Sequence, residues 1–227
     1  LLITTNDTGS GTDGDVEIDG GDTNLIIGAS TIDGDLDLVS GGTITDDGIA
    51  TVRGTLTATT DASHRVITLN ELAVTGALTL APHGTGAVTI VNAAGLNLAA
   101  STMGGTFSGT ATTGNITQSG ALDIEGTTTL VTTGQGATID LVTNGSGNAF
   151  TSELLITTNE TNSDKDAHVS IDGGTTNLII GTSTIDGNLA LRSGGTITDT
   201  DSSTVTVKGT LTATTDASNR LITLNDL

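Results

Sequence analysis

Short apolar-polar-apolar triplets recur along the chain, most of them just after a glycine. In Gly76-Ala77-Leu78-Thr79-Leu80, for example, Leu78 and Leu80 flank Thr79. A period of two places apolar residues on one face of a strand and polar residues on the other. The pattern therefore predicts short, half-buried strands that follow turns. They cover residues 15–18, 34–38, 54–57, 76–80, 86–90, 95–98, 120–124, 169–171 and 189–191.

The spacing of the triplets indicates how these strands are arranged. Two or three triplets fall within each stretch of about 20–25 residues, as one coil of a β-helix requires. A hairpin meander also uses short strands but does not call for this regular recurrence. In a β-helix the Leu, Ile and Val of each triplet point inward and the Thr and Asp point to solvent. The sequence thus predicts an all-β fold, a parallel β-helix (β-solenoid) with about 20–25 residues per coil.

The chain also repeats itself over a longer distance. Residues 1–46 reappear without a gap as residues 154–199, and about three quarters of the paired positions are identical. After a two-residue insertion the match resumes, with residues 55–72 against 210–227. We divide the chain into a first module, 1–153, and a partial second copy, 154–227, in one continuous solenoid. With strands about 4.8 Å apart, a module of roughly seven coils would advance about 35 Å along the axis.

The chain opens without an initiator methionine and stops inside the second module, so we expect it to belong to a longer polypeptide. Strand edges at the ends of a β-helix invite aggregation unless they are covered. We therefore expect further repeats of the same polypeptide, or head-to-tail copies, to cover each end.

Composition favours elongated β structure. The chain is 34% hydrophobic, yet its only aromatic residues are Phe107 and Phe150. Regular aliphatic runs, as at 24–27 and 66–69, distinguish it from a disordered linker. The single proline, Pro82, and the lack of a three-residue glycine period exclude collagen.

The charge of the chain limits its partners. There are 26 acidic residues against six Lys and Arg, a net charge of −20, so nucleic acids and anionic lipid surfaces would be repelled. No apolar run approaches the ~20 residues needed to cross a bilayer, so we expect no membrane insertion. The absence of cysteine fits a bacterial surface protein and excludes disulfides and thiolate metal sites.

Three phrases of the sequence resemble a known family. Residues 43–46 (Thr-Ile-Thr-Asp), 54–59 (Gly-Thr-Leu-Thr-Ala-Thr) and 117–124 (Thr-Gln-Ser-Gly-Ala-Leu-Asp-Ile) look like the filamentous haemagglutinin type of bacterial surface protein. The resemblance is one of general sequence pattern and extends over the whole chain. The family's amino-terminal secretion domain is not represented. The resemblance implies a giant, secreted, right-handed β-helix that forms a fibre or adhesin stalk at the cell surface, with a cell-surface or carbohydrate receptor.

Enzymes with this architecture need paired carboxylates, or carboxylates with a basic residue, in a groove. Asp13, Asp15, Glu17 and Asp19 alternate along one predicted strand and could form such a group. In the second module, however, His168 and Ser170 stand at the positions of Asp15 and Glu17.

We therefore predict that the chain is not an enzyme. A carbohydrate-binding or carbohydrate-cleaving β-helix remains the alternative. Ice binding by Thr-x-Thr pairs such as Thr55/Thr57 is disfavoured, because the pairs do not recur in every coil.

Calcium is the one ligand that the acidic residues suggest, because it prefers several carboxylate and carbonyl oxygens. Two candidates change between the modules, Asp35 to Asn188 and Asp37 to Ala190, and the nonapeptide of calcium-binding β-rolls is missing. We therefore expect weak calcium binding and no required cofactor. The candidate ligands are Asp19, Asp33, Asp35, Asp37, Asp172 and Asp186.

Other matched positions suggest structural roles. Arg65 and Arg220 each lie four residues after an acid, Asp61 or Asp216. We expect a loop ion pair or hydrogen bonds to corner carbonyls there, with an arginine-based binding site as the alternative.

His64 corresponds to Asn219, which favours a surface position over a metal ligand. The matched Asn24 and Asn177 are expected at corners, where asparagine side chains can stack in ladders.

Together these observations predict a structural segment of a large secreted surface fibre or adhesin stalk that mediates adhesion, or contact with other cells or matrix. Its location would be extracellular, at the bacterial cell surface. A self-assembling extracellular filament of non-covalently stacked subunits is the second alternative.

Overall fold

The computed structural model describes residues 1–6, 14–159 and 166–227. Over these residues the strands form three parallel sheets of ten, twelve and three strands, which run along one axis. The ten-stranded sheet contains β1 (Val16–Asp19), β3 (Leu36–Ser40), β5 (Leu56–Thr60), β7 (Ala77–Ala81), β9 (Leu96–Leu98), β12 (Ile116–Gln118), β15 (Ile139–Leu141), β18 (Val169–Asp172), β21 (Leu189–Ser193) and β24 (Leu211–Thr215).

The twelve-stranded sheet lies on the opposite face. It contains β2 (Leu25–Ile32), β4 (Ile44–Val52), β6 (Ile67–Val74), β8 (Val88–Asn92), β11 (Phe107–Ala111), β14 (Thr128–Thr132), β17 (Glu153–Thr157), β19 (Leu178–Ile180), β20 (Ser183–Ile185), β22 (Ile197–Asp199), β23 (Val205–Val207) and β25 (Ile222–Thr223). The smallest sheet contains β10 (Ser101–Met103), β13 (Leu122–Ile124) and β16 (Ala149–Phe150), and one 3-10 turn, η1, spans Gly145–Gly147.

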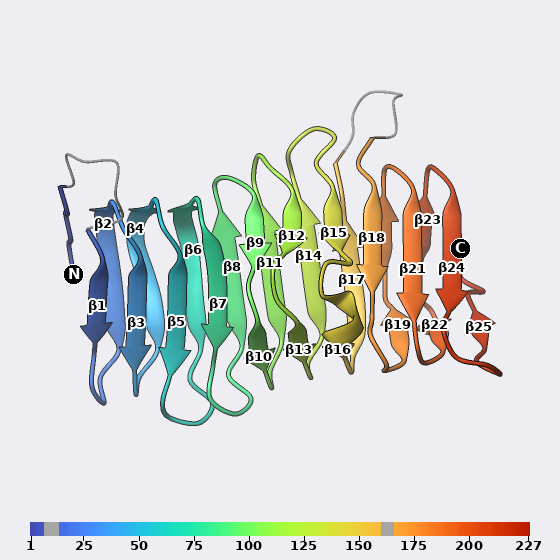
Figure 1. Ribbon diagram of the computed structural model, residues 1–227, viewed down its shortest axis with the longest axis horizontal. Coiled ribbons are helices and arrows are strands. Elements are labelled where there is room, and N and C mark those ends of the chain that lie inside the picture. The colour runs from blue at the N-terminus through green and yellow to red at the C-terminus, as the bar shows by residue number, and fades with distance from the viewer. Residues whose placement is uncertain (7–13, 160–165) are drawn as a thin grey trace.

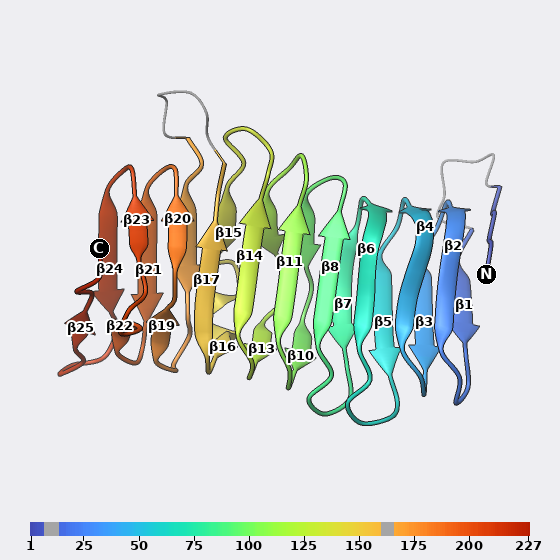
Figure 2. The ribbon, with the colours of Figure 1, turned by 180° about the vertical axis from the view of Figure 1, so that it is seen from behind.

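The chain winds as a right-handed solenoid. In Figure 1 the near strands β1, β3 and β5 point down as the chain advances from left to right, and in Figure 2 the strands of the opposite face point up. Crossovers between parallel strands almost always have this hand. The predicted parallel β-helix is confirmed, including the hand that the resemblance implied.

Cross-strand partners give the length of each coil, because a residue and its partner in the next strand stand one full turn apart. Val16 pairs with Leu36, and Ile116 pairs with Ile139. Both of these spacings fall within the range that the triplets predict. Ile139 pairs with Val169, so the coil that carries η1 is longer than its neighbours. The predicted coil length is therefore confirmed except at this long coil.

The long sequence repeat corresponds to a whole number of coils. Val16 opens β1, and its counterpart in the second module, Val169, opens β18. The order β1-β3-β5-β7-β9-β12-β15-β18 takes seven steps in the ten-stranded sheet. Each module therefore starts at the same point of the turn as the one before it.

The core is a narrow strip of aliphatic side chains. β3, β5 and β8 all alternate buried and half-buried positions, as the triplets predict. The two aromatic residues, Phe107 and Phe150, are also fully buried. Gly109 is the inward residue next to Phe107, and a Cβ there would lie 2.8 Å from Cζ of Phe107 and 2.9 Å from Cδ2 of Leu96. The ring of Phe107 thus occupies space that a side chain at residue 109 would need.

The matched corner asparagines tie successive coils together. Oδ1 of Asn24 accepts a hydrogen bond from the backbone N–H of Thr43 at 3.0 Å, and Oδ1 of Asn177 accepts one from Thr196 at 3.0 Å. Their corner positions are as predicted. The partner in each case is the backbone of the next coil, where the sequence suggested a ladder of asparagine side chains.

The aspartate of the repeated Thr-Ile-Thr-Asp phrase has a similar role. Oδ2 of Asp46 accepts the N–H of Glu71 at 2.7 Å, and Oδ2 of Asp199 accepts the N–H groups of Asn225 and Asp226, both at 2.8 Å. In both modules this carboxylate thus links its coil to the backbone of the next one.

A buried amide pair marks the long coil. Oδ1 of Asn148 accepts hydrogen bonds from Nε2 of Gln118 at 3.1 Å and from the N–H of Leu122 at 2.9 Å. Its Nδ2 donates to Oε1 of Gln118 at 2.9 Å and to the carbonyl of Asp172 at 2.8 Å. Because both side chains are buried, this network fixes the path of the chain from η1 into the smallest sheet.

Two features of the sheets go beyond the triplets. β2, β4 and β6 run eight or nine residues each, and β4 carries a register shift near Gly48, whose φ of 137° suits glycine. The smallest sheet exists only in the middle of the described chain.

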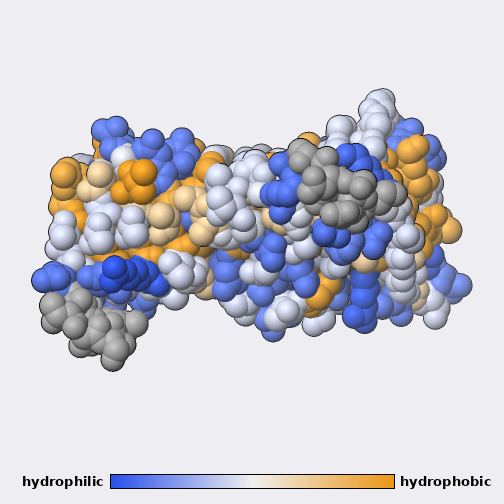
Figure 3. Space-filling model, turned by 90° about the horizontal axis from the view of Figure 1, so that it is seen from above, coloured by the Kyte–Doolittle hydropathy of each residue, from blue (hydrophilic) through white to orange (hydrophobic). Residues whose placement is uncertain are grey.

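Exposed apolar residues gather toward the two ends of the solenoid, where Figure 3 shows hydrophobic surface. Leu2 is 78% exposed and Leu221 is 69% exposed. Whether further repeats or stacked copies cover these ends, as the sequence predicts, stays a prediction.

Candidate functional site

The acids of the first strand belong to a structural column at one corner. Oδ1 of Asp15 accepts the N–H of Asp35 at 2.8 Å, and Oδ1 of Asp35 accepts the N–H of Thr55 at 2.6 Å. Glu17 is exposed and stands beside Asp37 in the next coil. Asp13 lies outside the described residues. Asp15 thus holds the next coil, and the alternating acids of the sequence do not all face one groove.

The second module builds the same column with different residues. Nδ1 of His168 accepts the N–H of Asn188 at 3.0 Å, and Oδ1 of Asn188 accepts the N–H of Thr210 at 2.8 Å. Because Nδ1 accepts, the neutral ring carries its proton on Nε2. Aspartate, asparagine and histidine can replace one another here because each supplies one side-chain acceptor for a backbone N–H of the next coil. The substitutions between modules therefore conserve a contact.

Two of the calcium candidates form ion pairs with the next coil. Oδ1 of Asp33 lies 2.6 Å from Nη1 of Arg53, and Oδ1 of Asp186 lies 2.7 Å from Nζ of Lys208. Both acidic side chains are only 9% exposed, whereas both basic side chains are more than half exposed. In both modules, therefore, a buried aspartate forms an ion pair with an exposed basic side chain of the next coil. Sequence reasoning missed this pair, although acid and base stand about one coil length apart in both modules.

The other candidates lie apart from these pairs. Oδ1 of Asp19 accepts the N–H of Gly21 at 2.8 Å, and Asp37 points outward from β3. Over residues 1–6, 14–159 and 166–227, no group of three or more His, Cys, Asp or Glu side chains is placed to hold a metal ion. The six predicted ligands do not converge on one point and so do not fit the six to eight oxygens that calcium takes.

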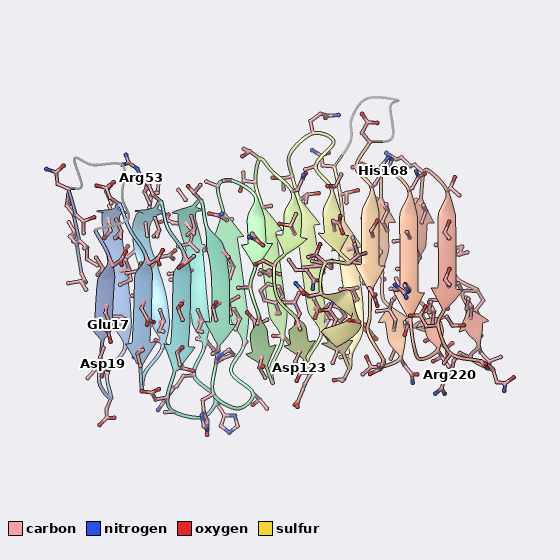
Figure 4. The ribbon with its side chains drawn as sticks, viewed as in Figure 1. Glu17, Asp19, Arg53, Asp123, His168 and Arg220 are labelled. Atoms are coloured by element: carbon pink, nitrogen blue, oxygen red, sulfur yellow. The ribbon has the colours of Figure 1, made fainter. Side chains whose placement is uncertain are left out.

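Asp172, the remaining candidate, belongs to a charged pocket that we call the arginine pocket. It is lined by Asp172, Arg192, Asp216 and Arg220, with Ser146 and Thr175, and its volume is about 370 Å³. Oδ1 of Asp172 accepts the N–H of Gly174 at 2.9 Å, and its side chain is 5% exposed. Figure 4 places Arg220 at the lower edge of the C-terminal end, far from Arg53 at the upper edge of the other end.

Arg192 is held on two sides in this pocket. Its Nε donates to Oδ1 of Asp216 at 2.9 Å, and its Nη1 lies 3.6 Å from Oδ2 of Asp172. The hydrogen bond and charge of Asp216, together with the charge of Asp172, raise the pKa of the Arg192 guanidinium above its usual value. The guanidinium is therefore charged and has an acid on two of its sides, although the side chain is 60% exposed.

Arg220 stands on a turn that both modules share. Asn219 has a φ of 61° and its counterpart His64 a φ of 64°. The left-handed region suits asparagine and accepts histidine, which explains the exchange. In the described part of the chain Asp216 forms its ion pair with Arg192, so the predicted loop pair between Asp216 and Arg220 is not the contact that the structure shows.

A second hollow, of about 630 Å³, opens over β19, β22 and β25. Glu153, Asp199 and Asp201 line it with several threonines. Asp199 is already engaged by backbone N–H groups, as described above. In the described ranges, no helix is long and apolar enough to cross a membrane.

Comparison with known protein families finds a match over most of the chain. A family model described as repeats of unknown function (DUF5649) matches residues 13–81, 85–157 and 166–227. The first and third matches begin at residues 13 and 166, which are equivalent positions of the two modules, so one sequence module covers two family repeats. No curated protein and no solved structure matches the chain.

Proposed function

We propose that this chain, which belongs to the family of repeats of unknown function (DUF5649), has a structural role. It would form a segment of a large secreted surface fibre or adhesin stalk that extends from the cell and mediates adhesion, or contact with other cells or matrix.

The observation that carries this proposal is the whole-turn repeat. The complete first module takes seven coils with a continuous aliphatic core, and the partial second copy begins at the same point of the turn, so modules can follow one another without a break. At about 4.8 Å per coil, each module adds about 34 Å of rod. A protein whose length grows in fixed steps is suited to set the distance between a cell and what it contacts.

Location and partners are part of the same proposal. The chain would act outside the cell, at the bacterial surface, without enzymatic activity or membrane insertion and without a nucleic-acid partner. Its net charge of −20 supports solubility of a long rod. Its neighbours would be further repeats of the same polypeptide, and a receptor would bind elsewhere along the fibre.

Electron microscopy of the native material, with mass spectrometry of the denatured polypeptide, tests the proposal. We expect thin fibres built from a polypeptide much longer than 227 residues. Fibres of small subunits would instead support the stacked filament, and compact particles would contradict both.

Antibody labelling of intact source cells tests the location. We expect labelling before permeabilisation, with the antibody against residues 1–227. Labelling that appears only after permeabilisation would contradict a surface fibre.

A further inference from the structure

We propose that the arginine pocket of the second module binds a carbohydrate that carries a carboxylate, such as a uronic acid residue. This goes beyond the stalk role, because it gives one coil of the rod a ligand of its own. The pocket lies between η1, β18, β21 and the turn after β24, and its volume is in the range of small-molecule sites.

The distribution of positive charge is the first reason. The chain has six Lys and Arg residues against 26 acids, and two of the six, Arg192 and Arg220, line this one pocket. Because Asp172 and Asp216 balance the two arginines, the pocket is formally neutral, whereas the chain as a whole carries a net charge of −20 and repels anions.

The geometry of Arg192 is the second reason. Asp216 takes its Nε–H and Asp172 lies beside Nη1, which leaves the other Nη hydrogens to face a ligand. The two acids favour this orientation of the guanidinium before anything binds, which reduces the side-chain entropy lost on binding. A planar guanidinium in fixed orientation matches a carboxylate in a two-point contact.

The burial of Asp172 explains how this orientation is maintained. Its side chain packs against Gly145 of η1, where a Cβ would lie 2.4 Å from Cβ of Asp172. The N–H of Gly174, at a φ of 65°, fixes Oδ1. The long coil that carries η1 thus closes one wall of the pocket around the acid.

The remaining lining selects the class of ligand. The hydroxyls of Ser146 and Thr175 and the carboxylate of Asp216 can bond to hydroxyl groups of a sugar. A phosphate would meet the arginines as well, but its higher charge would be repelled by Asp172 and Asp216 at the same site. A ligand with one carboxylate and several hydroxyls can bond both to the arginines and to the hydroxyl and carboxylate groups of the pocket.

The first module supplies a control within the same chain. It keeps Asp61 and Arg65 at the positions of Asp216 and Arg220, but Val39 stands at the position of Arg192. The first module therefore lacks the fixed guanidinium, and we expect it not to bind the same ligand.

Titration of the ¹⁵N-labelled chain with trigalacturonic acid, followed by NMR, tests the proposal. We expect shifts confined to residues around the pocket. Galactotriose, the neutral analogue, should bind at least tenfold more weakly. Arg220→Gln and Arg192→Val should each weaken binding of the acidic sugar at least tenfold, whereas Arg65→Gln in the first module should leave it unchanged. Circular dichroism and thermal unfolding would show that each variant keeps its fold.

Three results would overturn the proposal. Equal affinity for the acidic and neutral sugars would remove the role of the carboxylate. A loss on Arg65→Gln as large as that on Arg220→Gln would show charge attraction without a site. Inorganic phosphate that competes at the same concentration would show an unspecific anion site. None of these outcomes bears on whether the chain forms a fibre, so the stalk proposal stands or falls by microscopy alone.

Discussion

Exchange of the residues at 107 and 109 tests how the solenoid core is filled. Phe107 and Gly109 are two of the three inward residues of β11, and their partners in β8 are Val88 and Ile90. The two coils thus fill the same two positions, one with a large ring and no side chain and the other with two aliphatic residues. Phe107→Val with Gly109→Ile would copy β8 into β11.

The single changes should be costly. Phe107→Val removes part of a fully buried ring and leaves a cavity, at about 2–3 kcal/mol. Gly109→Ile adds a side chain whose Cβ alone would lie within 2.9 Å of two core atoms. We expect this overpacking to lower the free energy of unfolding by about 3 kcal/mol or more. The double change should cost only about 1 kcal/mol, because the new side chain fills the cavity. The favourable coupling is therefore expected to be about 4 kcal/mol, at or above the upper end of contacting pairs.

Thermal unfolding and native-state hydrogen exchange measure this. For a chain of this size about 1 kcal/mol corresponds to about 2–4 °C in melting temperature, so each single variant should melt about 5–10 °C lower and the double variant within a few degrees of the parent. Because repeat proteins can unfold in stages, exchange of the amides of β8, β11 and β14 should report the same ranking. A double variant that loses as much as the two single variants combined would refute this account of the core.

Two further substitutions probe the contacts between coils, and a titration probes the acidic residues. Lys208→Met should lower the free energy of unfolding in urea by about 1–2 kcal/mol, between the values for exposed and buried ion pairs. The reason is that the Asp186 side chain, only 9% exposed, loses its contact with Nζ of Lys208. No change at low salt would contradict a stabilising ion pair. Asn148→Leu should cost about 3 kcal/mol, because it strands Gln118 and the N–H of Leu122, and a neutral result would mean that the amide network is dispensable. Calorimetric titration with calcium should give weak binding without a saturating site, and one tight site would contradict the dispersed placement of the acids.

The strands were predictable from the sequence because their alternation needs only local information. Leu78 and Leu80 are buried, as the triplet at 76–80 predicts, and the coil length follows from the recurrence of such triplets. The extended β2, β4 and β6 were not predictable in this way, because bulges such as that near Gly48 interrupt the period.

The candidate site was harder to predict because its residues meet only through stacking. Arg192 lies one coil after Asp172 and one coil before Asp216, and the contact depends on the register of three coils. Arg220 and Asp216 are close neighbours along the chain, which suggested that they pair. Stacking instead brings Asp216 to Arg192.

A repeat that equals seven whole turns has a consequence for how such a gene can change. Unequal recombination between two modules adds or removes the codons of one complete module, and the new junction joins the same point of one turn to the same point of another. No strand changes face and no corner loses its acceptor, so each product keeps the contacts that join one coil to the next. A repeat of six and a half turns would instead bring each strand against the position of a strand of the opposite sheet at every crossover. The length of the solenoid can therefore change through copy number alone, without any new sequence having to be tested for folding.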